Sequence, residues 1–253
     1  MAKSGKTRGD RDGRTGARGR QARPARRQRS WLRRILRWAG RIAGGAALAV
    51  LALVVLFALV NPPVTHTIWS EWRRLGAVER TWVPGDAIAP VMFRAVVAAE
   101  DANFCRHWGF DMAAIRSAIE AGAERGASTI SQQVVKNVFL WQGRSWVRKA
   151  LEAALTPLVE AVWTKRRILV VYLNVAEFGE GIFGVEAAAR HYYGVAAAEL
   201  TPMQAARLAV VLPNPRARDP NALSQSLRRR AQRVADGAQT IRADGRAACF
   251  EEL

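Results

Sequence analysis

The sequence has few of the residues on which small secreted proteins and metalloenzymes depend. Only two cysteines occur, Cys105 and Cys249, too few for a disulfide framework. One bridge would form in an oxidising compartment, but two free thiols are the expectation. The chain also contains no P-loop, no HExxH sequence and no cluster of cysteines and histidines at metal-ligand spacing. The absence of these motifs means that the sequence indicates no nucleotide site of this type and identifies no metal ligands.

Acidic residues are nearly missing from the N-terminal part of the chain. Residues 1–41 hold 15 Lys and Arg against 2 Asp, a net charge of +13, which leaves only +5 of the chain's +18 for the rest. Such a basic arm suits nucleic acid or an anionic membrane. Residues 1–30 also have almost no apolar side chains. They cannot bury enough surface to offset the entropy of ordering, so we expect disorder there.

A long uncharged run follows the basic residues. Residues 42–60 carry no charge, and a helix of this length spans about 28 Å, close to the hydrocarbon thickness of a bilayer. We predict a transmembrane helix rather than a buried core helix or a cleaved signal peptide, because the run is longer than a signal-peptide core. Since the cations precede the span, the N-terminus is expected in the cytoplasm and residues 64–253 outside it. Nucleic acid is therefore not expected as a partner.

The remaining residues predict one mainly helical domain with weak strand signals. Helices are predicted over residues 90–102, 112–123, 130–140, 146–163, 165–174, 186–193, 202–212 and 224–238. Asp111 and Ser145 are expected to cap the helices that follow them, and Thr129 with Gln132 has the spacing of a capping box. We divide the chain into a basic disordered tail (1–41), a transmembrane helix (42–60), a juxtamembrane segment (61–90), a domain core (91–220) and a basic, partly helical C-terminal tail (221–253).

Three segments between residues 95 and 152 carry candidate chemistry. Glu100 lies in an apolar helical pattern, and burial raises the pKa of a carboxylate toward the range of a general base. Residues 126–137 predict a helix start, whose free N–H groups favour an anion such as phosphate. Residues 144–152 add cations and a second glutamate. Each segment alone fits a capped helix or a solvated surface, but their combination favours an active site.

Two side-chain contacts are also expected within these segments. His107 is close enough in sequence to hydrogen-bond Asp101 and hold the acidic pair in place. Gln132 and Lys136 are four residues apart, so we expect both to face the same ligand.

These segments resemble a known family. The sequences EDANFCRHWGFD (100–111), GASTISQQVVKN (126–137) and RSWVRKALE (144–152) are similar to the first three signatures of the family 51 peptidoglycan glycosyltransferases. Residues 165–194 and 202–215 resemble the remaining two, so the resemblance covers roughly residues 65–220. It implies a mainly α, lysozyme-like glycosyltransferase domain after one transmembrane helix. Only 33 residues follow Pro220. In this respect the chain resembles the monofunctional biosynthetic form of the family, which lacks a transpeptidase domain.

The resemblance implies an activity and roles for individual residues. Lipid II would be polymerised into glycan strands with release of undecaprenyl pyrophosphate, Glu100 would deprotonate the acceptor 4-hydroxyl, and Glu152 would be the second essential carboxylate. The substrate-binding residues would be Asp101, Phe104, His107, Ser128, Thr129, Gln132, Gln133, Lys136, Asn137, Arg144, Arg148 and Lys149. No cofactor is required by these residues, although a divalent cation, Mg²⁺ or Mn²⁺, is compatible with a phosphate leaving group.

The same resemblance implies a location and partners. The protein would be a single-pass protein of the bacterial inner membrane with a periplasmic catalytic domain. Its partners would be lipid II, the growing glycan strand, membrane lipid and other cell-wall synthesis proteins.

Two other functions stay open from the residues alone. A glycan-cleaving, lysozyme-like or lytic enzyme also uses carboxylates on a helical scaffold, but it has no pyrophosphate to stabilise. A non-enzymatic anchor would instead depend on its basic tail. A further choice concerns an apolar patch next to the cations, which is either core or a membrane-dipping edge. Its members are Phe139, Trp141, Trp146 and Val147.

Overall fold

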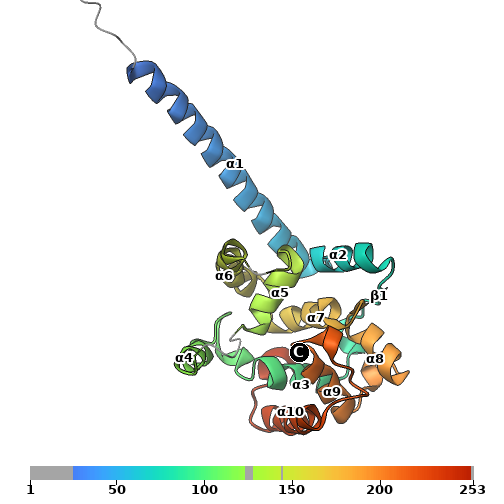
Figure 1. Cartoon of the computed structure of the whole chain (residues 1–253). Coiled ribbons are helices and arrows are strands. Elements are labelled where there is room, and N and C mark those ends of the chain that lie inside the picture. Colours follow the sequence, from blue (N-terminus) through green and yellow to red (C-terminus); the bar gives the residue numbers. More distant parts are fainter. Residues whose placement is uncertain (1–24, 123–127, 144, 252–253) are drawn as a thin grey trace, which may run out of the picture. The chain divides into compact units, whose positions relative to one another are not determined.

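The computed structural model describes residues 25–122, 128–143 and 145–251 of the 253-residue chain. The described residues divide into two compact units, one that ends at Ala49 and one that begins at Val50 (Figure 1). The boundary between them falls within the first helix, α1 (Ala25–Leu59).

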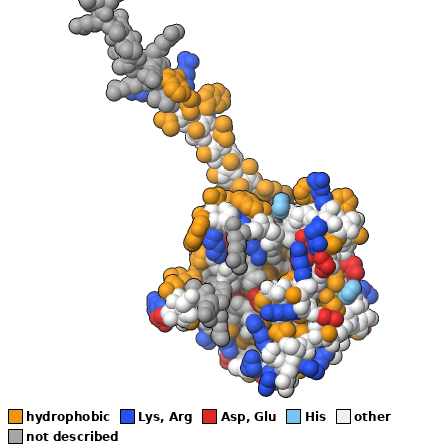
Figure 2. Space-filling model, viewed as in Figure 1, with side chains coloured by type: hydrophobic (Ala, Val, Ile, Leu, Met, Phe, Trp, Pro, Cys, Tyr) orange, Lys and Arg blue, Asp and Glu red, His pale blue; other side chains and the backbone are white. Residues whose placement is uncertain are grey.

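Helix α1 contains the predicted membrane span. The stretch Arg33–Leu59 is long and apolar enough to cross a membrane, and only 6% of its most apolar part is buried. Hydrophobic side chains cover its surface in Figure 2. A helix in the core of a soluble protein would bury these side chains, so their exposure favours a helix surrounded by lipid. The disorder that we predicted for residues 25–41 was wrong, because these residues are helical and continuous with the span. The start of the span at residue 42 stays a prediction. The first 24 residues, for which we predicted disorder, lie outside the described residues.

The second unit is built around α7 (Lys165–Val175), which is buried along all of residues 168–175. On one side, α3 (Pro90–Glu100), α9 (Pro202–Val211) and α10 (Gln225–Ala243) pack against one another. On another, α5 (Ile130–Phe139) contacts both α7 and α6 (Trp146–Val162). The remaining helices are α2 (His66–Leu75), α4 (Met112–Glu120), α8 (Val185–Tyr193) and α11 (Ala248–Glu251), with short 3-10 turns η1 (Gly85–Ala87), η2 (Phe104–Arg106), η3 (Ala197–Glu199) and η4 (Pro215–Ala217).

The expected helix starts are confirmed by their caps. The Asp111 carboxylate accepts the Ala114 N–H at 2.9 Å, so α4 begins where predicted. Thr129 and Gln132 form the predicted capping box at the start of α5. The Ser145 hydroxyl accepts the Arg148 N–H and so caps α6, as predicted. These caps join residues three apart, which is why the sequence alone can predict them.

A small sheet brings the predicted juxtamembrane segment into the domain. Its strands are β1 (Glu79–Arg80), β2 (Glu177–Gly179) and β3 (Ile182–Phe183), in the order β1-β3-β2. β1 pairs parallel with β3, and β2 pairs antiparallel with it. The side chain of Asn174 also accepts the N–H of Val83 at 2.9 Å and donates to its carbonyl at 3.0 Å. The predicted juxtamembrane segment, residues 61–90, therefore contributes to the folded domain. Its part in the sheet was not predicted, because strands this short leave no alternating pattern.

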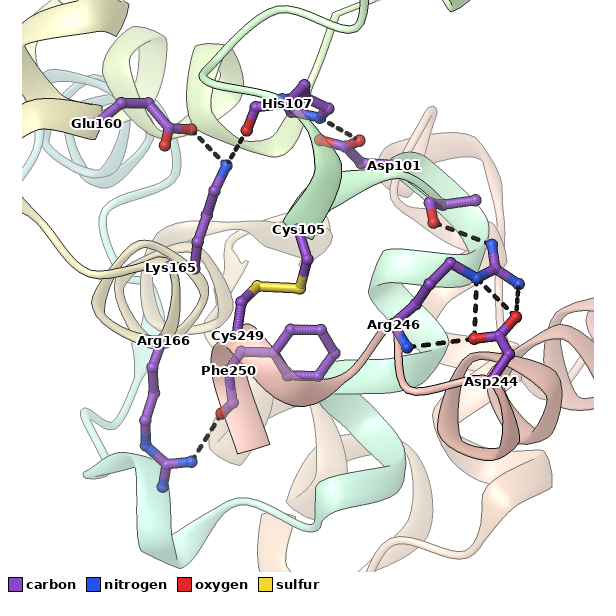
Figure 3. The surroundings of a disulfide bond; sticks show 11 residues. Asp101, Cys105, His107, Glu160, Lys165, Arg166, Asp244, Arg246, Cys249 and Phe250 are labelled. Atoms are coloured by element: carbon purple, nitrogen blue, oxygen red, sulfur yellow. Dashed lines mark hydrogen bonds and ion pairs between the residues drawn. A yellow bond between two sulfur atoms is a disulfide. The ribbon is translucent and has the colours of Figure 1, made fainter. Parts of the chain in front are cut away.

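The C-terminal residues that we assigned to a tail belong to the core as well. α10 buries a row of small and aliphatic side chains where it packs on α3 and α9, namely Ala231, Val234, Ala235, Ala238 and Ile241. Beyond it, Cys249 forms a disulfide with Cys105 (Figure 3). The expectation of two free thiols was wrong, because only the fold brings α11 beside η2 across 144 residues of sequence.

Replacing both cysteines by serine should lower the free energy of unfolding of the second unit by about 2–5 kcal/mol, because the bridge closes a long loop in the unfolded chain. Urea unfolding of the detergent-solubilised protein would measure the change. Adding a reductant should destabilise the wild type to the same extent and leave the double variant unaffected. Equal midpoints for the two proteins would contradict the prediction.

Candidate active site

Two cavities in the second unit meet at Gln133. The first, the Glu100 cavity, has a volume of about 670 Å³ and is lined by Glu100 at the end of α3, by Ser128 and by residues of α10. The second, the Lys136 cavity, has a volume of about 460 Å³ and is lined by Lys136 and Asn137 of α5 together with residues of α2 and of the loop after α9. Both volumes are typical of small-molecule sites. Lys and Arg side chains are spread over the visible face of this unit (Figure 2).

Glu100 is held in place by a chain of hydrogen bonds. The Gln133 amide donates to Glu100 Oε2 at 3.0 Å, and the Tyr172 hydroxyl donates to Gln133 Oε1 at 3.1 Å. Burial raises the pKa of Glu100, while the Gln133 bond and the charges of Arg230 and Arg218 oppose that rise. The result is a fixed carboxylate with a raised pKa at the wall of a cavity, as a general base requires.

Tyr172 was missed as a site residue. Its position on the apolar face of a helix predicted only core packing, and the side chain is indeed buried. Burial and the negative charge of Glu100 raise the pKa of Tyr172 well above its ordinary value, so the hydroxyl remains a donor. A buried tyrosine hydroxyl usually has a polar partner, but the sequence does not say which one.

Asp101 and its neighbours connect the elements that carry the site residues. The predicted contact is confirmed: His107 Nε2 lies 2.8 Å from Asp101 Oδ1 (Figure 3). The other oxygen of Asp101 accepts the backbone N–H of Ile130, the first residue of α5, at 3.0 Å. Phe104 is fully buried. Since α3 ends at Glu100, these residues do not continue its helix as we expected, and none of the three predicted residues lines either cavity.

The start of α5 divides the predicted polar residues into two groups. Gln132 is buried, and its side-chain oxygen accepts the Thr129 N–H at 3.0 Å. The Thr129 hydroxyl donates to the Gly109 carbonyl at 2.7 Å. Our prediction that Gln132 and Lys136 face one ligand was therefore wrong, because the cap takes the Gln132 side chain. Ser128, in contrast, is exposed and lines the Glu100 cavity.

A cluster of cations surrounds the buried carboxylate of Glu152. Arg148 Nη1 donates to Glu152 Oε2 at 2.7 Å, and Lys149 Nζ bonds the other oxygen. Lys149 Nζ also lies 3.2 Å from Ser128 Oγ. Burial lowers the pKa of Lys136, the charges of Arg148 and Lys149 lower it further, and Glu152 and Glu100 oppose them. Three cations around one inner carboxylate leave surplus positive charge, which suits an anion.

Arg144 lies outside the described residues. Among the residues that the structure does describe, no group of three or more His, Cys, Asp or Glu side chains could hold a metal ion. A Mg²⁺ ion would have to take most of its ligands from phosphate oxygens and water, so no residue is assigned to it.

Residues 67–239 match the model of a protein family described as Transglycosylase. The chain belongs to the transglycosylase family. A protein named biosynthetic peptidoglycan transglycosylase from Jannaschia sp. (strain CCS1) is 61% identical over 214 residues, which cover 85% of this chain and 90% of that protein. Proteins of the same name from Rhodospirillum centenum and Yersinia pseudotuberculosis are 46% and 51% identical, over 87% and 70% of this chain and over 98% and 79% of their own lengths.

The transglycosylase match begins in α2 and ends in α10, and it therefore includes segments that we had placed outside the core. α2 contributes a wall of the Lys136 cavity. Gln142 Nε2 joins that wall to α5, because it lies 2.8 Å from Thr67 Oγ1 and 3.3 Å from Asn137 Oδ1. Glu71 of α2 is buried and pairs with Arg216 at 2.7 Å. The pair was not predicted, because its members are far apart in the chain.

The apolar patch of the transglycosylase separates into two parts. Phe139 packs in the core, with its ring centroid 6.0 Å from that of Phe57 and 6.1 Å from that of Trp163. Trp146 and Val147, at the start of α6, are 91% and 65% exposed. Core packing thus holds for Phe139, whereas the membrane-dipping edge stays a prediction for the exposed Trp146 and Val147. α6 also exposes Leu151, Leu158 and Val162.

Replacing Gln133 by leucine should raise the pKa of Glu100 further, because the substitution removes the amide donor that stabilises the ionised carboxylate. The proton is then lost only at higher pH. Titration of the side-chain carboxyl carbon by NMR would measure the shift. Asn137→Leu serves as a matched control, since Asn137 lines only the Lys136 cavity and should leave the titration unchanged. An unshifted Glu100 pKa in Gln133→Leu would rule out this role of the bond.

Proposed function

We propose that this protein is a peptidoglycan glycosyltransferase that polymerises lipid II into glycan strands and releases undecaprenyl pyrophosphate. The observation that carries the proposal is the placement of Glu100, a cavity-lining carboxylate with a raised pKa, close enough to Lys136 for the two charges to interact. Arg148 and Lys149 act on Lys136 in turn. One group can take a proton while the other receives an anion. The family and the names of the relatives support the same reaction.

The reaction follows from these two parts. Glu100 accepts the proton of the acceptor 4-hydroxyl, and the oxygen attacks the anomeric carbon of the donor. The bond from that carbon to the pyrophosphate oxygen breaks with inversion, and the pyrophosphate leaves with the electron pair. Lys136, Arg148 and Lys149 stabilise the charge that develops on it, which is the largest contribution in many enzymes. The proton on Glu100 then returns to solvent.

Glu152 acts in this scheme by holding two of the cations. Its side chain is buried, and both oxygens are bonded to cations of its own helix. Charge-assisted bonds of this kind are short and directional, so they keep Arg148 and Lys149 in place before the substrate binds. A glycan-cleaving enzyme would have no departing phosphate for this cluster. The charge therefore favours transfer over cleavage.

The apolar N-terminal helix fits a single-pass membrane anchor. We further propose that the N-terminus is cytoplasmic and that the catalytic domain is exported to the periplasmic side. The cations before the span support this orientation. The Cys105–Cys249 disulfide supports it independently, because such bonds persist in oxidising compartments. The lipid chain of the substrate would then remain in the bilayer while its headgroup enters the cavities. Association with other cell-wall synthesis proteins and use of a divalent cation stay predictions.

Glu100→Gln should reduce polymerisation of lipid II by at least about 100-fold, because it removes the general base. Gel analysis of the polymer made from labelled lipid II would measure the loss. Glu120→Gln is the matched control, since Glu120 is exposed on α4 and lines neither cavity. A near-normal rate for Glu100→Gln would exclude the assigned role. Degradation of isolated sacculi by the wild type, with no polymer from lipid II, would exclude the proposed function.

Trp146 should lie in the lipid interface, because the residue is 91% exposed on a helix that exposes further apolar residues. Brominated phospholipids should quench its fluorescence when the full chain is reconstituted in vesicles. The difference between the wild type and Trp146→Phe isolates this ring from the other tryptophans. Equal quenching of the two proteins would mean that Trp146 faces water.

A further inference from the structure

Two further cations, Arg230 and Arg233, lie on α10 and line the Glu100 cavity, whereas Lys136 lines the other cavity. Arg230, Arg233, Val234 and Gly237 are spaced so that they share one face of the helix. Val234 is buried, and a Cβ atom added at Gly237 would lie 3.4 Å from the Cβ of Ala98. This face of α10 therefore rests directly on α3, two residues before Glu100.

The two arginines line the Glu100 cavity together with Glu100 and Ser128. Arg230 is half-buried and Arg233 is exposed. Within the part of the chain that the structure describes, neither forms an ion pair. The charge of Arg230 also reaches Glu100, where it opposes the effect of burial on the pKa. The cavity thus has two unused cations near the reacting carboxylate.

Several other cations near the two cavities already have hydrogen-bond or ion-pair partners. Arg148 and Lys149 bind Glu152, and Arg216 pairs with Glu71. Arg218 donates to the carbonyl of Val210 at 2.8 Å. The α10 pair is in addition firmly supported, because its helix packs on α3 and α9 and the chain beyond it is tied to η2 by the disulfide (Figure 3). Two guanidinium groups on a helix held in this way are suited to a carboxylate, which such groups bind in a planar, two-pronged geometry.

We propose that Arg230 and Arg233 form a carboxylate-binding subsite for the peptide that the glycan substrate carries. The proposal rests on the function proposed above. The sugar rings of such a strand offer no charge to these arginines, whereas its peptide carries ionised carboxylates. The pyrophosphate is the other anion of the substrate, and the Lys136 cluster accounts for it. The subsite thus selects strands whose peptides keep their acidic groups.

The test compares two forms of lipid II, one with free peptide carboxylates and one in which they are amidated. With the free form, the double variant Arg230→Gln/Arg233→Gln should raise KM about tenfold or more, since hydrogen bonds between charged groups contribute about 1.5–3 kcal/mol. With the amidated form, the wild type and the variant should have the same KM. Both forms retain the pyrophosphate, so an equal rise with both would assign the arginines to that group and overturn the proposal.

Arg228→Gln/Arg229→Gln is the matched control. It removes the same charge from the same helix, but both residues are exposed and neither lines the Glu100 cavity. Its KM should equal that of the wild type. A rise in KM as large as that of the cavity variant would mean that only the net charge of α10 matters, and it would overturn the proposal. Arg233→Gln alone, at an exposed position that packing does not constrain, should show a smaller rise confined to the free form.

The result separates the two proposals. Absence of polymer from wild-type protein would reject the glycosyltransferase itself. Normal polymerisation by the wild type, with unchanged KM in both arginine variants, would reject only the carboxylate subsite.

Discussion

The buried carboxylate of Asp101 joins the two halves of the site. One oxygen accepts the backbone N–H of Ile130 at 3.0 Å, and the other lies 2.8 Å from His107 Nε2. The first bond connects the end of α3 to the start of α5, and it therefore sets the position of Glu100 relative to Gln133. Removing a hydrogen-bond partner of a buried charge lowers the stability of the fold, because the charge is left uncompensated. The base, its amide donor and the cavity at which they meet all depend on this carboxylate.

Buried glutamates repeat the same arrangement elsewhere in the domain. Glu152 holds two cations of its own helix, and Glu71 pairs with Arg216. Glu160 accepts bonds from Ser131 and from Lys165, whose Nζ lies 2.9 Å away. In each case an acid that is withdrawn from solvent keeps a cation or a neighbouring helix in place. Positive charge at the cavities is thereby positioned without a substrate, which preorganises the site for an anion.

Local and distant interactions differ in how far they could be predicted. Asp111 and Thr129 were identified as helix caps because each bonds a residue three positions away. The limits of the domain were wrong at both ends. The strand β1 has two residues and leaves no alternating pattern. α10 buries mostly alanines, so its inward face is hard to distinguish from a polar surface. Short strands and small side chains give weak periodicity even where packing is extensive.

The sequence by itself determined the helical class, the apolar span and the residue types of the site, because charge, periodicity and caps are local properties of the chain. Only the tertiary structure decided which side chains meet. It turned Gln133 toward Glu100 and left Gln132 in a cap, and it brought Arg230 to the same cavity. It also paired Cys105 with Cys249. These contacts join distant segments, and the packing of helices on a shared core selects them.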